Sequence, residues 1–181
     1  MKALKSFLPV IVLLLINTSS YCQNYIYFAT ANESLFDSTC RKKVRILSKG
    51  EVFLVTKEST YKREFINVTC ISDGKAGFVH KNHLKKEKEL SSDSAGGNAL
   101  ASAKREYVKP YGRFKNTCKK ATIKLFFMNK NYILKPGETQ EFSGIKAGTQ
   151  HYKLQTPGYQ PLYTDDDFEP YHIVEVELFL E

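Results

Sequence analysis

The sequence predicts an all-β protein made of two small β modules joined by a flexible linker. Short runs in which apolar and polar residues alternate recur along the chain, and glycine, asparagine and aspartate separate them, which is the pattern of half-buried strands and turns. Aromatic residues, all tyrosine or phenylalanine, make up 13% of the 181 residues and also favour strands. Hydrophobic residues at 42% and charged residues at 25% are ordinary for a globular protein, so a coiled coil, a collagen-like repeat and wholesale disorder are excluded.

The N-terminus, residues 1–22, has the three parts of a secretory signal peptide. Lys2 and Lys5 precede the apolar run Phe7–Ile16, and the polar stretch that follows ends at Cys22. Small side chains stand three residues and one residue before the next peptide bond, where a signal peptidase needs them. We therefore expect cleavage between Cys22 and Gln23 and a periplasmic or secreted protein.

Two alternatives for this leader are weaker. As a helix, Phe7–Ile16 spans about 15 Å, roughly half of the hydrocarbon core of a bilayer, which disfavours a membrane anchor. Lipid attachment at Cys22 is disfavoured because the bulky Tyr21 precedes it, where lipoproteins have a small residue. No other apolar run is long enough to cross a bilayer, so we expect no transmembrane segment in the mature chain.

The first predicted module covers residues 23–86. Asp73-Gly74 predicts a tight hairpin, because glycine accepts a positive φ without steric cost, and Gly50 closes another turn. The predicted strands are Tyr25–Ala29, Val44–Leu47, Glu51–Lys57, Phe65–Ser72 and Ala76–His80.

Residues 87–106 are interpreted as the linker. The chain here is first charged and then rich in serine, alanine and glycine, and it cannot bury enough apolar surface to offset its ordering entropy. Part of it, around Asn98–Arg105, has the composition of a short helix.

The second predicted module, residues 107–181, is a small antiparallel β-sandwich. In Ile173–Leu180 the residues Val174, Val176, Leu178 and Leu180 share one face, and glutamates occupy the other, which is typical of a half-buried strand in an antiparallel sheet. The other predicted strands are Thr122–Met128, Tyr132–Leu134, Thr139–Phe142 and Gln150–Gln155, with turns at 129–131, 136–137, 147–148 and 157–158.

The first module resembles the bacterial SH3-like (SH3b) domain, a half-open barrel. The residues that carry the resemblance follow the family's Val-x-x-x-Leu-x-x-Gly step and its Asp-Gly-x-x-Gly-aromatic-Val hairpin: Val44, Leu47, Gly50, Asp73, Gly74, Gly77, Phe78 and Val79. Phe78 replaces the family's usual tryptophan, and the Arg-Ser-Gly-Pro stretch of many members is absent at Leu35–Ser38. The second module resembles, more faintly, PEGA-type and transthyretin-like sandwiches through residues 145–149 and Pro157-Gly158-Tyr159.

The SH3-like resemblance implies a peptide or a peptidoglycan fragment held against an aromatic-lined groove. On that basis the candidate ligand-binding residues are Tyr61, Phe65 and Phe78, with Arg41, Lys42 and Lys43 on the rim. The alternative for Phe65 and Phe78 is packing in the core. The dense basic run favours an anionic partner or is simply solvated.

Three cysteines remain after the expected cleavage, and the compartment is oxidising. We favour a disulfide between Cys40 and Cys70, because both fall in one module, and this leaves Cys118 over. The alternative is that Cys70, which alternates with Ile66 and Val68, is a buried thiol.

Other chemistry has weak signals. His80 and His83 with the two cysteines lack the spacing of a zinc knuckle, so we expect no metal and no cofactor. A cysteine peptidase would need a helix at Cys118, and none is indicated. The acidic run Asp165–Asp167 lacks the spacing of a calcium loop and is interpreted as a solvated loop.

The sequence therefore favours an exported, non-enzymatic binding protein of the cell envelope. Its expected partner is a cell-wall peptide or glycan, or an envelope protein; export argues against nucleic acid. A structural adaptor of an envelope complex is the alternative, and an accessory domain of a cysteine peptidase is a weaker one. The oligomeric state is not indicated.

Overall fold

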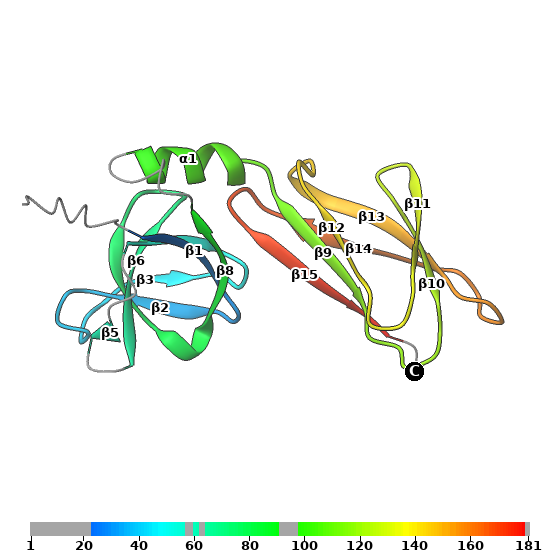
Figure 1. Cartoon of the computed structure of the whole chain (residues 1–181), viewed down its shortest axis with the longest axis horizontal. Helices are drawn as coiled ribbons and strands as arrows, with labels where there is room; N and C mark the ends of the chain where they lie inside the picture. Colours follow the sequence, from blue (N-terminus) through cyan, green and yellow to red (C-terminus); the bar gives the residue numbers. More distant parts are fainter. Residues whose placement is uncertain (1–22, 57–59, 62–63, 91–97, 180–181) are drawn as a thin grey trace, which may run out of the picture.

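The computed structural model describes residues 23–56, 60–61, 64–90 and 98–179. The expected leader and its cleavage position at Cys22 lie outside these residues, and Gln23 is the first residue described. The all-β prediction is confirmed: the described residues are mostly strand, with one α-helix among them. Figure 1 shows the strands gathered in two bodies, with α1 (Asn98–Tyr107) across the N-terminal one.

The N-terminal body is one antiparallel sheet that does not close into a barrel. Its strand order is β3-β2-β7-β6-β4-β1-β8, with β5 beside β6, and a short 3₁₀ helix, η1 (Lys81–His83), precedes β8. Alternate residues of the strands, such as Ile66, Val68 and Cys70, pack in a core on one face. The strands are β1 (Asn24–Ala29), β2 (Glu33–Phe36), β3 (Lys43–Leu47), β4 (Val52–Thr56), β5 (Thr60–Tyr61), β6 (Phe65–Cys70), β7 (Ala76–His80) and β8 (Leu84–Leu90).

The C-terminal body is a β-sandwich of two sheets, ordered β11-β10-β13-β14 and β12-β9-β15. Phe114 of β9 is fully buried between them, with ring centroids 5.0 Å from both Phe127 and Tyr152 and 5.5 Å from Phe142. The strands are β9 (Tyr111–Asn116), β10 (Ile123–Phe127), β11 (Lys130–Leu134), β12 (Thr139–Phe142), β13 (Gly148–Gln155), β14 (Leu162–Phe168) and β15 (Ile173–Leu178).

The antiparallel prediction is wrong for the last strand. β15 pairs in parallel with β9, with Ile173 opposite Tyr111 and Leu178 opposite Asn116. The alternation of side chains fixes which residues share a face and says nothing about strand direction, so the predicted faces hold: Val174, Val176 and Leu178 pack on the sandwich core. Leu180 lies outside the described residues.

The acidic run is also not a loop, because Asp165, Asp166 and Asp167 lie in β14. Each carboxylate has a polar partner on the neighbouring strand β13, which explains why a strand tolerates three aspartates. Asp165 lies 3.3 Å from the ring of His151, and the other two accept hydrogen bonds of 2.6 Å from the hydroxyls of Tyr152 and Thr149. Burial, together with the bond to Asp166, raises the pKa of Tyr152 above its usual range.

Residues 87–106 were interpreted as a flexible linker with a short helix around Asn98–Arg105; the helix is present, but the described part of the segment packs on the N-terminal sheet. β8 continues to Leu90, and α1 begins at Asn98. Ala99, Ala103 and Tyr107 are one helical turn apart and form a buried stripe against the N-terminal sheet, which supplies the apolar contact that we expected the segment to lack. Of the described chain, no helix has the length and apolar character to span a membrane.

A third apolar cluster joins the two bodies. Ile173 of the C-terminal body is 1% exposed and packs with the helix stripe against residues of β1 and β4. Its N–H donates to the carbonyl of Gly50 over 2.9 Å, and the N–H of Val52 donates to the carbonyl of Tyr171 over 3.0 Å. The turn that precedes β15 is therefore bonded to the turn that precedes β4.

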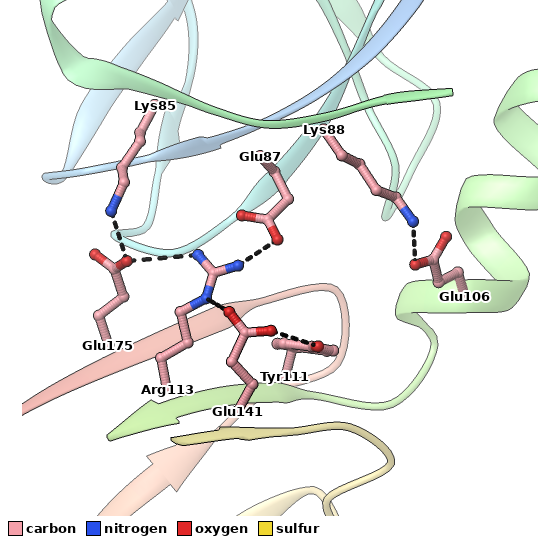
Figure 2. A network of polar contacts seen from close by, with 8 residues as sticks. All are labelled: Lys85, Glu87, Lys88, Glu106, Tyr111, Arg113, Glu141 and Glu175. Carbon is pink, nitrogen blue, oxygen red and sulfur yellow. Dashed lines mark hydrogen bonds and ion pairs between the residues drawn. The ribbon is translucent and has the colours of Figure 1, made fainter. Parts of the chain in front are cut away.

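An ionic network centred on Arg113 of β9 covers another side of this junction (Figure 2). The Arg113 side chain is 14% exposed and donates to Glu87 of β8 and, over 2.9 Å, to Glu141 of β12. Glu175 of β15 lies 3.6 Å from the same guanidinium and accepts a hydrogen bond of 2.8 Å from Lys85. The carboxylates hold the pKa of Arg113 above its usual range despite its burial, so it stays charged.

Candidate functional site

Phe65 and Phe78, two of the predicted ligand-binding residues, lie on the outer face of the N-terminal sheet. On β6 and β7 the alternate residues Ile66, Gly77 and Val79 are buried, whereas Phe65 and Phe78 are half-buried on the opposite face. The alternative interpretation, that the two rings pack in the core, is therefore wrong. They remain candidates for binding.

Two residues that the sequence analysis did not select extend this surface. Phe36 is the cross-strand partner of Phe78, and its ring centroid lies 5.7 Å from that of Phe65, edge to face. The ring of His80 lies 5.5 Å from Phe65 and 5.7 Å from His83. We call Phe36, Phe65, Phe78 and His80 the outer aromatic patch.

The edge strand β3 adds aliphatic and basic groups beside this patch. Lys43 is exposed and is the cross-strand partner of Phe36, where a shift in register marks a bulge. Ile46, the partner of Ser34, is 76% exposed, and Val44 is 47% exposed. Apolar side chains this exposed on an edge strand form a surface that favours a partner.

The turn between β2 and β3 presents the two other predicted rim residues, Arg41 and Lys42, and both are exposed. Asp37 holds the turn: its Oδ1 accepts hydrogen bonds from the hydroxyl and N–H of Thr39 at 2.7 and 3.0 Å, and from the N–H groups of Arg41 and Lys42 at 3.4 Å. The Thr39 hydroxyl, followed by these N–H groups, lowers the pKa of Asp37. The turn thus fixes a basic rim at one end of the patch.

Tyr61 is placed only by its backbone. It lies in β5, where it is the cross-strand partner of Phe65, and its side chain lies outside the described residues. The register nevertheless brings Tyr61, Phe65 and Phe78 to neighbouring strands. Phe36 was missed because β2 was not predicted as a strand, although its cross-strand neighbours were selected.

The predicted disulfide between Cys40 and Cys70 is not formed in the structure, and both residues are thiols. Cys70 is fully buried at the end of β6, with its inward neighbours Ile66 and Val68, whereas Cys40 lies in the turn after β2 with a φ of 55°. The alternative of a buried thiol therefore describes Cys70. Burial raises its pKa to about 11, although the nearby Arg45 favours the thiolate.

The histidine and cysteine residues that we considered for a metal site or a catalytic site do not lie together. Cys118, half-buried, has its Sγ 4.0 Å from the carbonyl of Leu178. His80 lies on the outer face of the sheet, opposite to Cys70. Within the described ranges, no group of three histidine, cysteine or acidic side chains is placed to hold a metal ion.

Comparisons with protein-family models, with curated proteins and with solved structures found no match for this chain. The outer aromatic patch and its basic rim are therefore the features from which we infer a function.

Proposed function

We propose that this chain is an exported, non-enzymatic binding protein of the cell envelope, periplasmic or secreted, whose SH3-like N-terminal module binds a peptide or a peptidoglycan fragment. The observation that carries the proposal is the outer aromatic patch, in which Phe36, Phe65 and Phe78 remain half-buried on the surface with exposed Lys43 beside them. Its leader pattern supports export, and the sequence resemblance supports the class of ligand.

The chemistry of the patch suits a short peptide that carries carboxylates. Edge-to-face rings offer an apolar surface that is already ordered, so binding costs little side-chain entropy. Arg41, Lys42 and Lys43 would attract acidic groups and raise the association rate, an effect that salt screens. We therefore expect the aromatic residues to set the affinity and the basic residues to set the salt dependence.

The test is co-sedimentation of the purified protein with isolated peptidoglycan sacculi. We expect Phe36→Ala and Phe78→Ala to reduce the bound fraction strongly, since truncating a central aromatic residue costs more than about 1 kcal/mol, or a factor of about five. Phe179→Ala is the matched control, because Phe179 is 63% exposed and lies outside the patch. Circular dichroism shows whether the variants keep the fold.

Equal sedimentation of the wild type, the Phe36→Ala variant and the control would contradict the proposal. So would binding that survives in all aromatic variants and disappears only when salt is raised, because that result describes nonspecific attraction to a basic protein.

The second candidate function is a structural adaptor of an envelope complex. It is favoured by β3, an edge of the described sheet that carries exposed Val44 and Ile46. Such an edge can accept a strand from a partner protein. Crosslinking with mass spectrometry in the native envelope tests it: Ile46→Lys should remove a protein crosslink and leave sedimentation with sacculi unchanged.

A further inference from the structure

The outer face of the β11-β10-β13-β14 sheet contains a groove of about 660 Å³ that lies on the other body from the outer aromatic patch. Two of its walls are aromatic: Phe126 of β10 is 41% exposed and Tyr163 of β14 is 71% exposed. Ile123, Leu125 and Phe127 of β10 point into the sandwich, so Phe126 is directed to the groove by the alternation of the strand.

The two rings stand in one row across the sheet. Phe126 is the cross-strand partner of Lys153, and Lys153 is the partner of Tyr163. Because neighbouring strands lie about 4.8 Å apart, the Cα atoms of Phe126 and Tyr163 are about 10 Å apart. The ammonium of Lys153 lies 5.4 Å from the centroid of the Tyr163 ring, a contact that restricts this exposed ring.

Hydrogen-bonding groups of both kinds surround the rings. Asn131 and Gln155 each offer an amide donor and an acceptor, Lys153 offers donors, and Asp165 offers acceptors. The lining carries two lysines, Lys124 and Lys153, and one carboxylate, Asp165, so its formal charge is small. The groove therefore lacks the cluster of basic groups that a polyanion needs and the cluster of carboxylates that a strongly basic ligand needs.

We propose that this groove binds a linear, uncharged oligosaccharide. A pyranose ring has an apolar face of C–H groups, which suits an aromatic ring, and an edge of hydroxyls, each both donor and acceptor, which suits amides and a carboxylate. The spacing of Phe126 and Tyr163 is comparable with the length of two linked pyranose rings, so the first and the third of three successive sugars can lie on the two side chains. We expect the oligosaccharide to be linear because Phe126 and Tyr163 lie along a single row of the sheet.

The experiment is isothermal titration calorimetry of the purified protein with chitotetraose and with cellotetraose, two linear uncharged probes. We expect saturable binding of at least one probe. Phe126→Ala and Tyr163→Ala should each weaken it about tenfold, as expected when an aromatic residue that carries much of the binding energy is truncated. Both residues are exposed, so these substitutions should leave the fold intact, as circular dichroism can verify.

Two variants separate this site from other surfaces. Tyr159→Ala is the matched control, because Tyr159 is 57% exposed on the same body and does not line the groove. Phe78→Ala alters the outer aromatic patch. Unchanged affinity in both supports the groove as the site; failure of both tetrasaccharides to bind at millimolar concentration, or wild-type affinity in Phe126→Ala and Tyr163→Ala, overturns the proposal. Loss of binding in Phe78→Ala alone also overturns it, because the sugar would then occupy the N-terminal sheet.

Discussion

Substitution of Gly50 by alanine tests the junction between the two bodies. Gly50 has a φ of +85°, and a Cβ atom added there would lie 2.5 Å from the carbonyl oxygen of Ile173. Real Cβ atoms do not approach a backbone oxygen so closely, so the turn that precedes β15 must move away. The variant therefore perturbs two things at once: the local conformation of the turn and the contact between the bodies.

The expected loss can be built up from these two parts. The left-handed conformation costs a residue with a Cβ about 1 kcal/mol. Displacing the turn weakens the hydrogen bonds that join Ile173 to Gly50 and Val52 to Tyr171, each worth about 1 kcal/mol net, and exposes part of the Ile173 side chain, whose full burial is worth about 2 kcal/mol. We expect a loss of about 4 kcal/mol, a large fraction of the stability of an ordinary domain.

Gly74→Ala provides the matched control, because Gly74 has a similar φ of +76° and nothing lies within 4 Å of its added Cβ. It should lose only the conformational part. The assay is urea denaturation followed by circular dichroism, with hydrogen exchange at the amides of Ile173 and Val52. In Gly50→Ala these amides should exchange faster while the cores stay protected. Equal destabilisation of the two variants would refute the reasoning, because the contact with Ile173 would then contribute nothing.

Two further predictions concern buried polar groups. Arg113→Met leaves three carboxylates without their shared cation; because two of them are partly exposed, we expect a loss of about 3 kcal/mol in urea denaturation, against less than about 1 kcal/mol for Lys88→Met, whose pair with Glu106 is more exposed. Between pH 9 and 11 the Cys70 thiol ionises in the unfolded chain only, so the free energy of unfolding should fall as pH rises. Over this range we expect the wild type to lose about 3 kcal/mol more than the Cys70→Ala variant. Equal losses of stability in Arg113→Met and Lys88→Met would contradict the prediction for Arg113. Parallel pH profiles of stability for the wild type and Cys70→Ala would contradict the prediction for Cys70.

The strands found from sequence are those whose side chains alternate or form apolar runs between turn residues. β6 and β7 were located within two residues at each end, with their hairpin at Asp73-Gly74, where Gly74 has the expected positive φ. Two of the strands that were missed, β8 and β14, are rich in charge. β8 reads LKKEKEL and pairs with the distant β1, and β14 contains three aspartates, so neither shows the apolar alternation of a half-buried strand.

The candidate site was predicted only in part, because β2 was not predicted as a strand. Phe65 and Phe78 were selected through a family resemblance, and the structure places them together with Phe36, whose strand has no clear alternation. Tyr163 is not predicted from the sequence, because the acidic residues that follow it in β14 are typical of a loop. Phe126 was within reach: the run IKLFF places it on the face opposite to three apolar residues, and a large ring on a solvent face is a signal of binding.

The apolar runs of β1 and β4 are a sequence signal that the N-terminal sheet is covered on both faces. β1 (NYIYFA) is buried at every position, and β4 (VFLVT) at all but its last, which is the pattern of strands that lack a solvent face. One face, with Phe53 and Val55, builds the N-terminal core, and the other, with Ile26, Phe28 and Leu54, packs on α1 and on Ile173. If the bodies separated, the part of this second face that packs on Ile173 would meet water. The apolar runs thus favour a docked arrangement of the two bodies, in which the outer aromatic patch of one and the groove of the other keep a fixed relative position.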